Sequence, residues 1–200
     1  MTISIRTNLI RAAIAAAALS LTACGPLIVL APAGGYAVGA AGATTLDRPW
    51  NDATGLLAGY KKVRLLTQDG LLLNRLYLTE GLVQGDHIVP PAQRREATTP
   101  TYSTAMSVTE QVEFVADSVA ALGYERVETT APRPVTINGH RGVRFDFTAV
   151  NADGLNYKGV GQAVKKDDRL FVAIYLATEE HYFAASLPSA TATMDALTFN

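Results

Sequence analysis

The sequence predicts an α+β domain in which an antiparallel sheet of about six or seven strands, a hairpin plus a meander, is covered by helices on both faces. Three observations predict it. Residues 143–149 alternate apolar and polar side chains, which is the period of a half-buried strand. Residues 107–122 repeat apolar side chains at helical spacing. Residues 170–177 are apolar at almost every position, which indicates a central strand with cover on both sides.

The first predicted element is a hairpin. Residues 62–66 and 72–78 flank the dipeptide Asp69-Gly70. This dipeptide tolerates the positive φ angles that a tight β-turn requires, so the two apolar runs are expected to pair as antiparallel strands.

A long irregular stretch follows, over residues 80–106. It contains Gly85, Pro90-Pro91, Arg94-Arg95 and Pro100, and it shows no clean period. Connections of this length are either functional rims or flexible excursions, and both readings stay open here. Arg94 and Arg95 are therefore our first candidate partner-binding residues.

A helix is predicted over residues 107–122. Ser107 and Glu110 have the spacing of a capping box, and Gly123 provides the stop signal. One apolar stripe is expected to face the sheet, formed by Val108, Val112, Val115, Val119 and Leu122.

The pattern then switches to period two, which predicts an antiparallel meander. The turn dipeptides Asn138-Gly139, Asp153-Gly154 and Asp167-Asp168 separate strands expected near residues 134–138, 141–150, 156–165 and 169–177. A further strand near 124–130 is expected to join them.

The second covering layer is predicted from the C-terminal segment. Thr178 is the expected helix cap, and Pro188 is expected to kink or split the helix. The apolar side chains at helical spacing are Phe183, Leu187, Ala190, Met194 and Leu197.

This order of hairpin, long loop, helix, meander and terminal helix resembles the PsbP-like α/β/α sandwich over roughly residues 47–200. The nearest matches are Thr67-Gln68-Asp69-Gly70 at the first turn and Gly142-Val143-Arg144-Phe145 at the start of a central strand. PsbP-like proteins mostly bind or scaffold other macromolecules. The resemblance therefore implies a non-catalytic binding or scaffolding module, although a fold by itself does not transfer a function.

The N-terminal segment has the pattern of an export signal. Arg6 and Arg11 precede the apolar residues 12–19, which lead into Leu21-Thr22-Ala23-Cys24. These four residues resemble the lipobox of bacterial lipoproteins, which implies removal of residues 1–23 and lipid attachment at Cys24. Residues 24–46, rich in Gly, Ala and Pro, are expected to be a tether without regular structure, and residues 47–200 a single globular domain.

The lipobox resemblance implies a location in the cell envelope, on the membrane through lipidated Cys24. Gly25 stands where Asp is associated with retention in the inner membrane, so the outer membrane facing the periplasm is favoured for a Gram-negative host. One alternative is an ordinary secretory signal with an accidental cysteine. The other is an uncleaved membrane helix from Leu9 to Ala43, which prolines and the pair Gly34-Gly35 would interrupt.

Composition and spacing leave little room for cofactor or nucleic-acid chemistry. With 17 basic and 18 acidic side chains the net charge is −1, so no basic footprint for nucleic acid exists. His87, His140 and His181 lack metal-ligand spacing, and neither a metal nor a cofactor is expected. The single cysteine cannot form an intramolecular disulfide.

One catalytic alternative stays open. Glu179, His181 and Tyr182 lie close in sequence and have the side chains of an acid/base cluster. No nucleophile motif accompanies them, and the favourable position of Glu179 and Glu180 in the first turn of the last helix explains this acidic pair adequately. An enzyme is therefore not the expected function.

The small residues Gly159, Gly161 and Ala163 give a second candidate partner-binding surface. They alternate along one predicted strand, so they leave one face of it shallow, either for a close-packed side chain or as a groove. Gly159 and Gly161 thus join Arg94 and Arg95 as candidate residues for an envelope protein partner. The alternative function is a periplasmic carrier of a small apolar ligand or lipid, for which the aliphatic sheet and the small-residue strand would supply the site.

Overall fold

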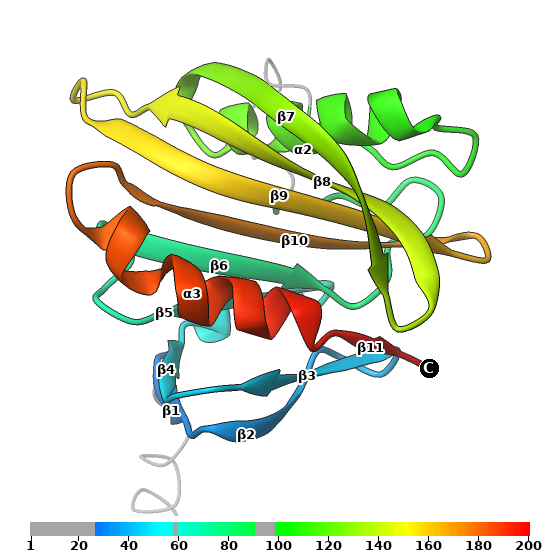
Figure 1. The fold of residues 1–200 in the computed structure, drawn as a ribbon, viewed down its shortest axis with the longest axis horizontal. Coiled ribbons are helices and arrows are strands. Elements are labelled where there is room, and N and C mark those ends of the chain that lie inside the picture. Colours follow the sequence, from blue (N-terminus) through cyan, green and yellow to red (C-terminus); the bar gives the residue numbers. More distant parts are fainter. Residues whose placement is uncertain (1–26, 58–59, 91–98) are drawn as a thin grey trace, which may run out of the picture.

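The computed structural model describes residues 27–57, 60–90 and 99–200. The lipobox with Cys24 and the doublet Arg94-Arg95 lie outside these residues. For these residues, Figure 1 shows a large twisted sheet with a smaller sheet beside one end of it, and helices beside the large sheet.

The large sheet has eight strands in the order β1-β4-β5-β6-β10-β9-β8-β7, and every neighbouring pair is antiparallel. The predicted hairpin and meander are both present. The strands are β1 (Val29–Ala31), β4 (Trp50–Asp52), β5 (Val63–Thr67), β6 (Asn74–Thr79), β7 (Glu125–Ile137), β8 (His140–Val150), β9 (Asn156–Lys166) and β10 (Arg169–Thr178). The smaller sheet has the order β11-β3-β2, with β2 (Gly34–Ala37), β3 (Gly42–Leu46) and β11 (Thr198–Phe199).

Strand β10 organises the interior, as its unbroken apolar run predicts. Residues 170–178 are all buried, and alternate side chains of a strand point to opposite faces. Leu170, Val172, Ile174 and Leu176 belong to one hydrophobic cluster. Phe171, Ala173, Tyr175 and Ala177 belong to the other.

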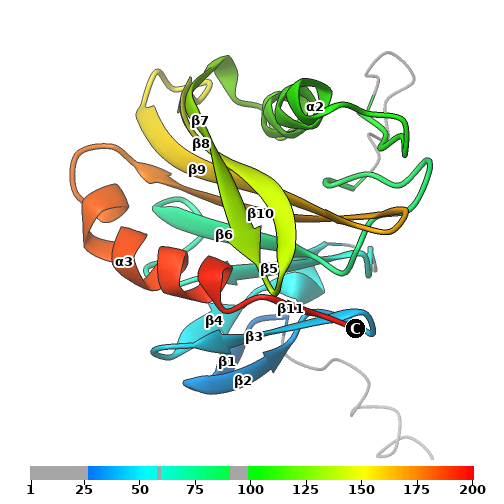
Figure 2. The ribbon, with the colours of Figure 1, turned by 45° about the vertical axis from the view of Figure 1, so that its right-hand side comes forward.

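Each helix contributes to a different one of these clusters (Figure 2). Helix α2 (Val108–Ala121) brings Phe114, Val115 and Val119 to the first, and helix α3 (Tyr182–Asp195) brings Ala190 and Met194 to the second. The small sheet also contributes to the second cluster. A short 3-10 helix, η2 (Thr54–Leu56), connects β4 to β5.

The predicted capping box of α2 is confirmed. The Ser107 hydroxyl accepts from the Glu110 backbone N–H, and the Glu110 carboxylate accepts from the Ser107 N–H at 2.7 Å. The predicted stripe is partly wrong, because Val108 is exposed while Phe114 and Ser118 are buried. The buried face is therefore rotated away from the first residue of the helix.

Gly159 and Gly161 do not leave an open groove on the face of the small residues. A methyl group at Gly159 would collide with the ring of Phe147, and one at Gly161 with the ring of Phe145. Each phenylalanine is the register partner of the glycine on β9. The two rings of β8 therefore fill the space that the missing side chains leave on β9.

A buried polar network ties the β5–β6 hairpin to α3. The Asn74 side-chain oxygen accepts from Thr67 Oγ1 at 2.9 Å and from the Gln68 N–H at 2.8 Å. The Asp69 carboxylate accepts from the Asn74 amide and, at 3.4 Å, from the hydroxyl of Ser186 on α3. The predicted turn thus also holds the last helix in place.

The prediction of an irregular tether over residues 24–46 is wrong from residue 29 on. It supplies β1, β2 and β3, and Ala31, Val38 and Leu46 are buried in the second cluster. These residues show no clean period, so no local pattern predicts their strands. β2 and β3 pair with each other, while β1 pairs with β4 and β3 also pairs with β11. No helix in the described part of the chain is long and apolar enough to cross a membrane.

Two further boundaries differ from the prediction. The strands expected near 124–130 and 134–138 form the single edge strand β7, which tolerates Pro132 and Pro134 because register shifts near Ala131 absorb the irregularity. Thr178 ends β10, and α3 begins after His181 and runs on through Pro188. Pro188 is exposed, and the buried Ser189 and Ala190 beside it hold the helix against the sheet.

Gly161→Ala should lower the free energy of unfolding by about 1–3 kcal/mol, because the added methyl group must displace the Phe145 ring. Gly35→Ala is the matched control, since its methyl group meets no atom within 4 Å. It should leave stability unchanged or raise it by up to about 1 kcal/mol. Urea denaturation measures both, and equal effects of the two variants would contradict the filled-face account.

The Glu110 capping contact predicts a pH dependence. The hydrogen bonds from Ser107 lower the pKa of Glu110 below its ordinary value. Its stabilising contribution is therefore complete above the unfolded-state pKa and is lost as the pH falls through the lower folded-state pKa. Glu110→Ala should destabilise the protein more at pH 7 than at pH 3 in urea titrations. If the loss of unfolding free energy in Glu110→Ala is as large at pH 3 as at pH 7, the ionised Glu110 carboxylate does not provide the capping stabilisation.

Candidate functional site: a groove beside the last helix

The candidate site is a groove between α3 and the outer strands β7, β8 and β9, with a volume of about 420 Å³. It forms because the last helix covers the centre of the sheet, while β7 to β9 extend past it (Figure 1). Alternation on β8 decides what lines it. Phe145 and Phe147 are buried in the first cluster, and the intervening Arg144, Asp146 and Thr148 point to the groove.

One wall of the groove is apolar. Phe183, Leu187 and Thr191 are spaced four residues apart on α3, so they lie along one line of the helix. Val160 of β9 continues the apolar surface onto the floor. This wall is open to a ligand because Phe183 and Leu187 are only partly buried.

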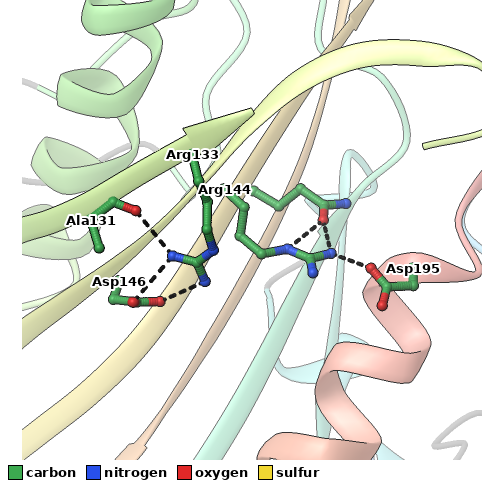
Figure 3. Close-up of polar contacts among 6 residues, drawn as sticks. Ala131, Arg133, Arg144, Asp146 and Asp195 are labelled. Carbon is green, nitrogen blue, oxygen red and sulfur yellow. Dashed lines mark hydrogen bonds and ion pairs between the residues drawn. The ribbon is translucent and has the colours of Figure 1, made fainter. Parts of the chain in front are cut away.

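The opposite side of the groove carries a bidentate ion pair (Figure 3). Arg133 of β7 donates from both terminal nitrogens to Asp146, at 3.1 and 2.9 Å, and also to the Ala131 carbonyl at 3.0 Å. Both side chains are 45% exposed. An exposed pair contributes at most about 1 kcal/mol to stability, so it is free to exchange partners.

A second arginine plays a structural part. Arg144 is the cross-strand neighbour of Arg133, but its side chain is only 13% exposed. It donates to the Gln162 side-chain oxygen and to the carboxylate of Asp195, the last residue of α3 (Figure 3). Gln162 is buried and donates to the Met194 carbonyl at 3.2 Å. This chain fastens the C-terminal end of α3 to β8 and β9.

A further ion pair closes the other end of the groove. Lys158 of β9 lies 2.9 Å from Glu179, which precedes α3. The lining therefore holds three cations, Arg133, Arg144 and Lys158, each next to a carboxylate. The groove thus offers paired donors and acceptors beside an apolar wall, and not a strong field of one sign.

The residues singled out from the sequence divide between this groove and other places. Gly159 lines the groove with its backbone, while Gly161 lies under the Phe145 ring. Arg94 and Arg95 lie outside the described residues. Loop residues near that doublet pack into the first cluster, among them Leu82, Ile88 and Tyr102. The part of the 80–106 stretch that is described is therefore not a free excursion.

The acid/base alternative finds no joint geometry. Glu179 is occupied by Lys158, and His181 is exposed and meets Tyr182 edge-on, with ring centroids 5.0 Å apart. His87, at a distance in the loop, contacts the Pro100 carbonyl at 2.9 Å through Nδ1. Among the residues that the structure describes, no three His, Cys, Asp or Glu side chains gather as a metal site requires.

Sequence reasoning missed Arg133, Asp146, Phe183 and Leu187 as a group. Part of the signal was present, because Asp146 is a polar position of the alternating strand and both apolar residues belong to the predicted helix. What the sequence does not contain is the pairing of these elements across the sheet.

Gln162→Leu should lower the free energy of unfolding by about 1–3 kcal/mol, since it removes the partner of Arg144 and leaves the Met194 carbonyl unpaired. Arg133→Ala should cost less than about 1 kcal/mol. Thermal and urea unfolding of the two variants measure the contrast. Equal losses would mean that the Arg133–Asp146 pair is structural too.

Comparison with known proteins bears on the fold. No protein-family model matches the sequence, and the search of curated proteins found no match. The Ran-binding protein Mog1p of Saccharomyces cerevisiae has a similar solved structure, with 11% identity, a TM-score of 0.52, and coverage of 84% of this chain and 96% of Mog1p.

Two other solved structures match at a TM-score of 0.42. Cyanobacterial PsbP from Synechocystis is 8% identical, with 88% of this chain and 84% of that chain covered. A Pseudomonas aeruginosa protein of unknown function is 12% identical, with 69% and 81% covered. Of these three structures, Mog1p is the one similar enough to indicate a shared fold, and the likeness concerns the fold alone.

Proposed function

We propose that this protein is a lipid-anchored, non-catalytic binding module of the cell envelope, with a PsbP-like α/β/α domain that engages a partner protein through the groove beside α3. The observation that carries the proposal is the groove itself, in which an apolar wall faces exposed, exchangeable ion pairs. Mog1p is a Ran-binding protein, so a similar fold serves protein binding elsewhere. We transfer no partner from it.

The chemistry of the groove defines the partner. Phe183 and Leu187 offer contact to an apolar side chain, and Arg133 and Asp146 offer a donor fork and a carboxylate within the same groove. A peptide segment with an apolar residue beside charged ones matches both features. Charged pairs at a rim favour orientation and specificity more than affinity, which suits a reversible contact.

The anchor rests on the sequence. The lipobox Leu21-Thr22-Ala23-Cys24 supports acylation of Cys24, cleavage before it, and a place on the periplasmic side of the outer membrane. Two or three acyl chains hold a protein on a bilayer, whereas one binds reversibly. The domain would then present its groove to other envelope components.

The carrier of an apolar ligand is the second candidate, and the apolar line of Phe183, Leu187 and Val160 favours it. The filled face at Gly159 and Gly161 counts against it, because the phenylalanine rings occupy the space that the carrier hypothesis assigned to a ligand.

The anchor predicts incorporation of labelled palmitate into the chain in its host, and complete loss of the label in Cys24→Ser. Globomycin should retard the mobility of the natural chain by blocking removal of residues 1–23. Unlabelled natural chain, or label that persists in Cys24→Ser, would exclude lipid attachment at Cys24.

The groove predicts a site-specific crosslink. A benzoylphenylalanine at position 187 should yield a protein adduct in intact envelopes, and the same group at the exposed Ala120 of α2 should not. Arg133→Ala should lower the adduct at position 187 severalfold while the melting temperature stays nearly unchanged. Equal adducts at both positions, or no effect of Arg133→Ala, would argue against the groove.

A further inference from the structure

Strand β1 exposes an apolar run that the protein itself does not cover. Leu27, Ile28, Val29 and Leu30 are 59%, 47%, 46% and 68% exposed. Val29 and Leu30 point to opposite faces of the sheet, so neither face of β1 is covered at this point. Contiguous exposed apolar side chains mark a contact surface more often than single ones do.

This run lies at an edge, where a further surface is available. β1 is the first strand of the large sheet and pairs only with β4 among its described neighbours. The exposed Leu56 extends the patch, because the adjacent Gly55 lies against the Leu27 backbone. We call Leu27, Ile28, Val29, Leu30 and Leu56 the β1 patch.

Basic side chains border the β1 patch. Lys61 and Arg64 line a surface hollow of about 330 Å³ together with Leu27 and Val29. The acid in this hollow, Asp52, already accepts from the Tyr36 hydroxyl at 2.7 Å and from the Thr54 N–H at 2.9 Å. Apolar side chains with adjoining cations match the acyl boundary and the anionic headgroups of a lipid surface.

Chain length fixes where this patch must be if Cys24 is acylated. Leu27 is three positions after Cys24, and an extended chain spans about 3.3–3.6 Å per residue. Leu27 then lies within roughly 10 Å of the lipidated residue, and Leu30 within roughly 20 Å. The patch cannot be far from the bilayer surface.

We propose that the β1 patch is a membrane-contact surface that seats the domain directly on an anionic leaflet. The inference rests on the proposed lipid anchor for its geometry. β1 thereby orients the domain, with the large sheet rising from the bilayer at its β1 edge. The groove beside β7 and β8, at the other end of the strand order, then lies away from the lipid.

The test uses the chain from residue 24 in two forms, acylated and with Cys24→Ser, and vesicles of phosphatidylethanolamine and phosphatidylglycerol with brominated acyl chains. Leu30→Trp places a fluorophore in the patch. Leu155→Trp is the matched control, since Leu155 is exposed in the β8–β9 turn, with β4, β5, β6 and β10 between β1 and β9. Trp50 is fully buried and adds the same background fluorescence to both tryptophan variants.

In the acylated form, Leu30→Trp should be quenched at least twofold more than Leu155→Trp. In the Cys24→Ser form, binding to the vesicles should fall at least tenfold in the double variant Ile28→Asp and Leu30→Asp, but not in Leu155→Asp. If the chain is not acylated in its host but the Cys24→Ser form still binds vesicles, the β1 patch is supported and the lipid anchor is excluded.

Two results would overturn the inference and leave the anchor intact. One is normal acylation with equal quenching at positions 30 and 155. The other is a dimer in sedimentation that Leu30→Asp dissociates, without vesicle binding by the Cys24→Ser form, which would assign the β1 edge to a second copy of the chain.

Discussion

The structure depends on the burial of β10 on both faces. A strand that is apolar on both faces must be covered on both sides. The two hydrophobic clusters provide this cover with different elements. Helix α2 and the loop after β6 serve one cluster, and α3 with the small sheet serves the other. The capping box at Ser107 fixes where α2 begins, and the hairpin turn contacts α3 through Asp69 and Ser186.

The two proposed contact surfaces lie where this cover does not reach. Helix α3 stops short of β7 and β8, which leaves the polar face of β8 beside an apolar helix wall. At the other edge, Val29 and Leu30 of β1 stay exposed. Inside, Phe145 and Phe147 complete the packing against Gly161 and Gly159. The two proposed contacts therefore occupy opposite edges of one sheet.

Residue patterns over short stretches correctly predicted the elements whose structure depends on neighbouring residues. The hairpin at Asp69-Gly70, the capped helix after Ser107, the meander and the central strand all follow from spacing within a few residues. The strands at residues 29–46 could not be predicted, because their residues show no clean period and both β1 and β3 pair with strands far away in the sequence, β4 and β11. The groove was missed for the same reason, since Arg133 and Asp146 are 13 residues apart and their geometry depends on a bulge at Ala131.

Our central proposal is that the protein binds a partner at its surface and carries no cargo, since Phe145 and Phe147 fill the space beside Gly161 and Gly159. Native mass spectrometry of the protein released intact from its host's envelope tests this most directly. We expect the mass of the chain from residue 24 with its acyl groups, and no further bound molecule. A further small molecule that stays bound at stoichiometric ratio after gentle activation would contradict it.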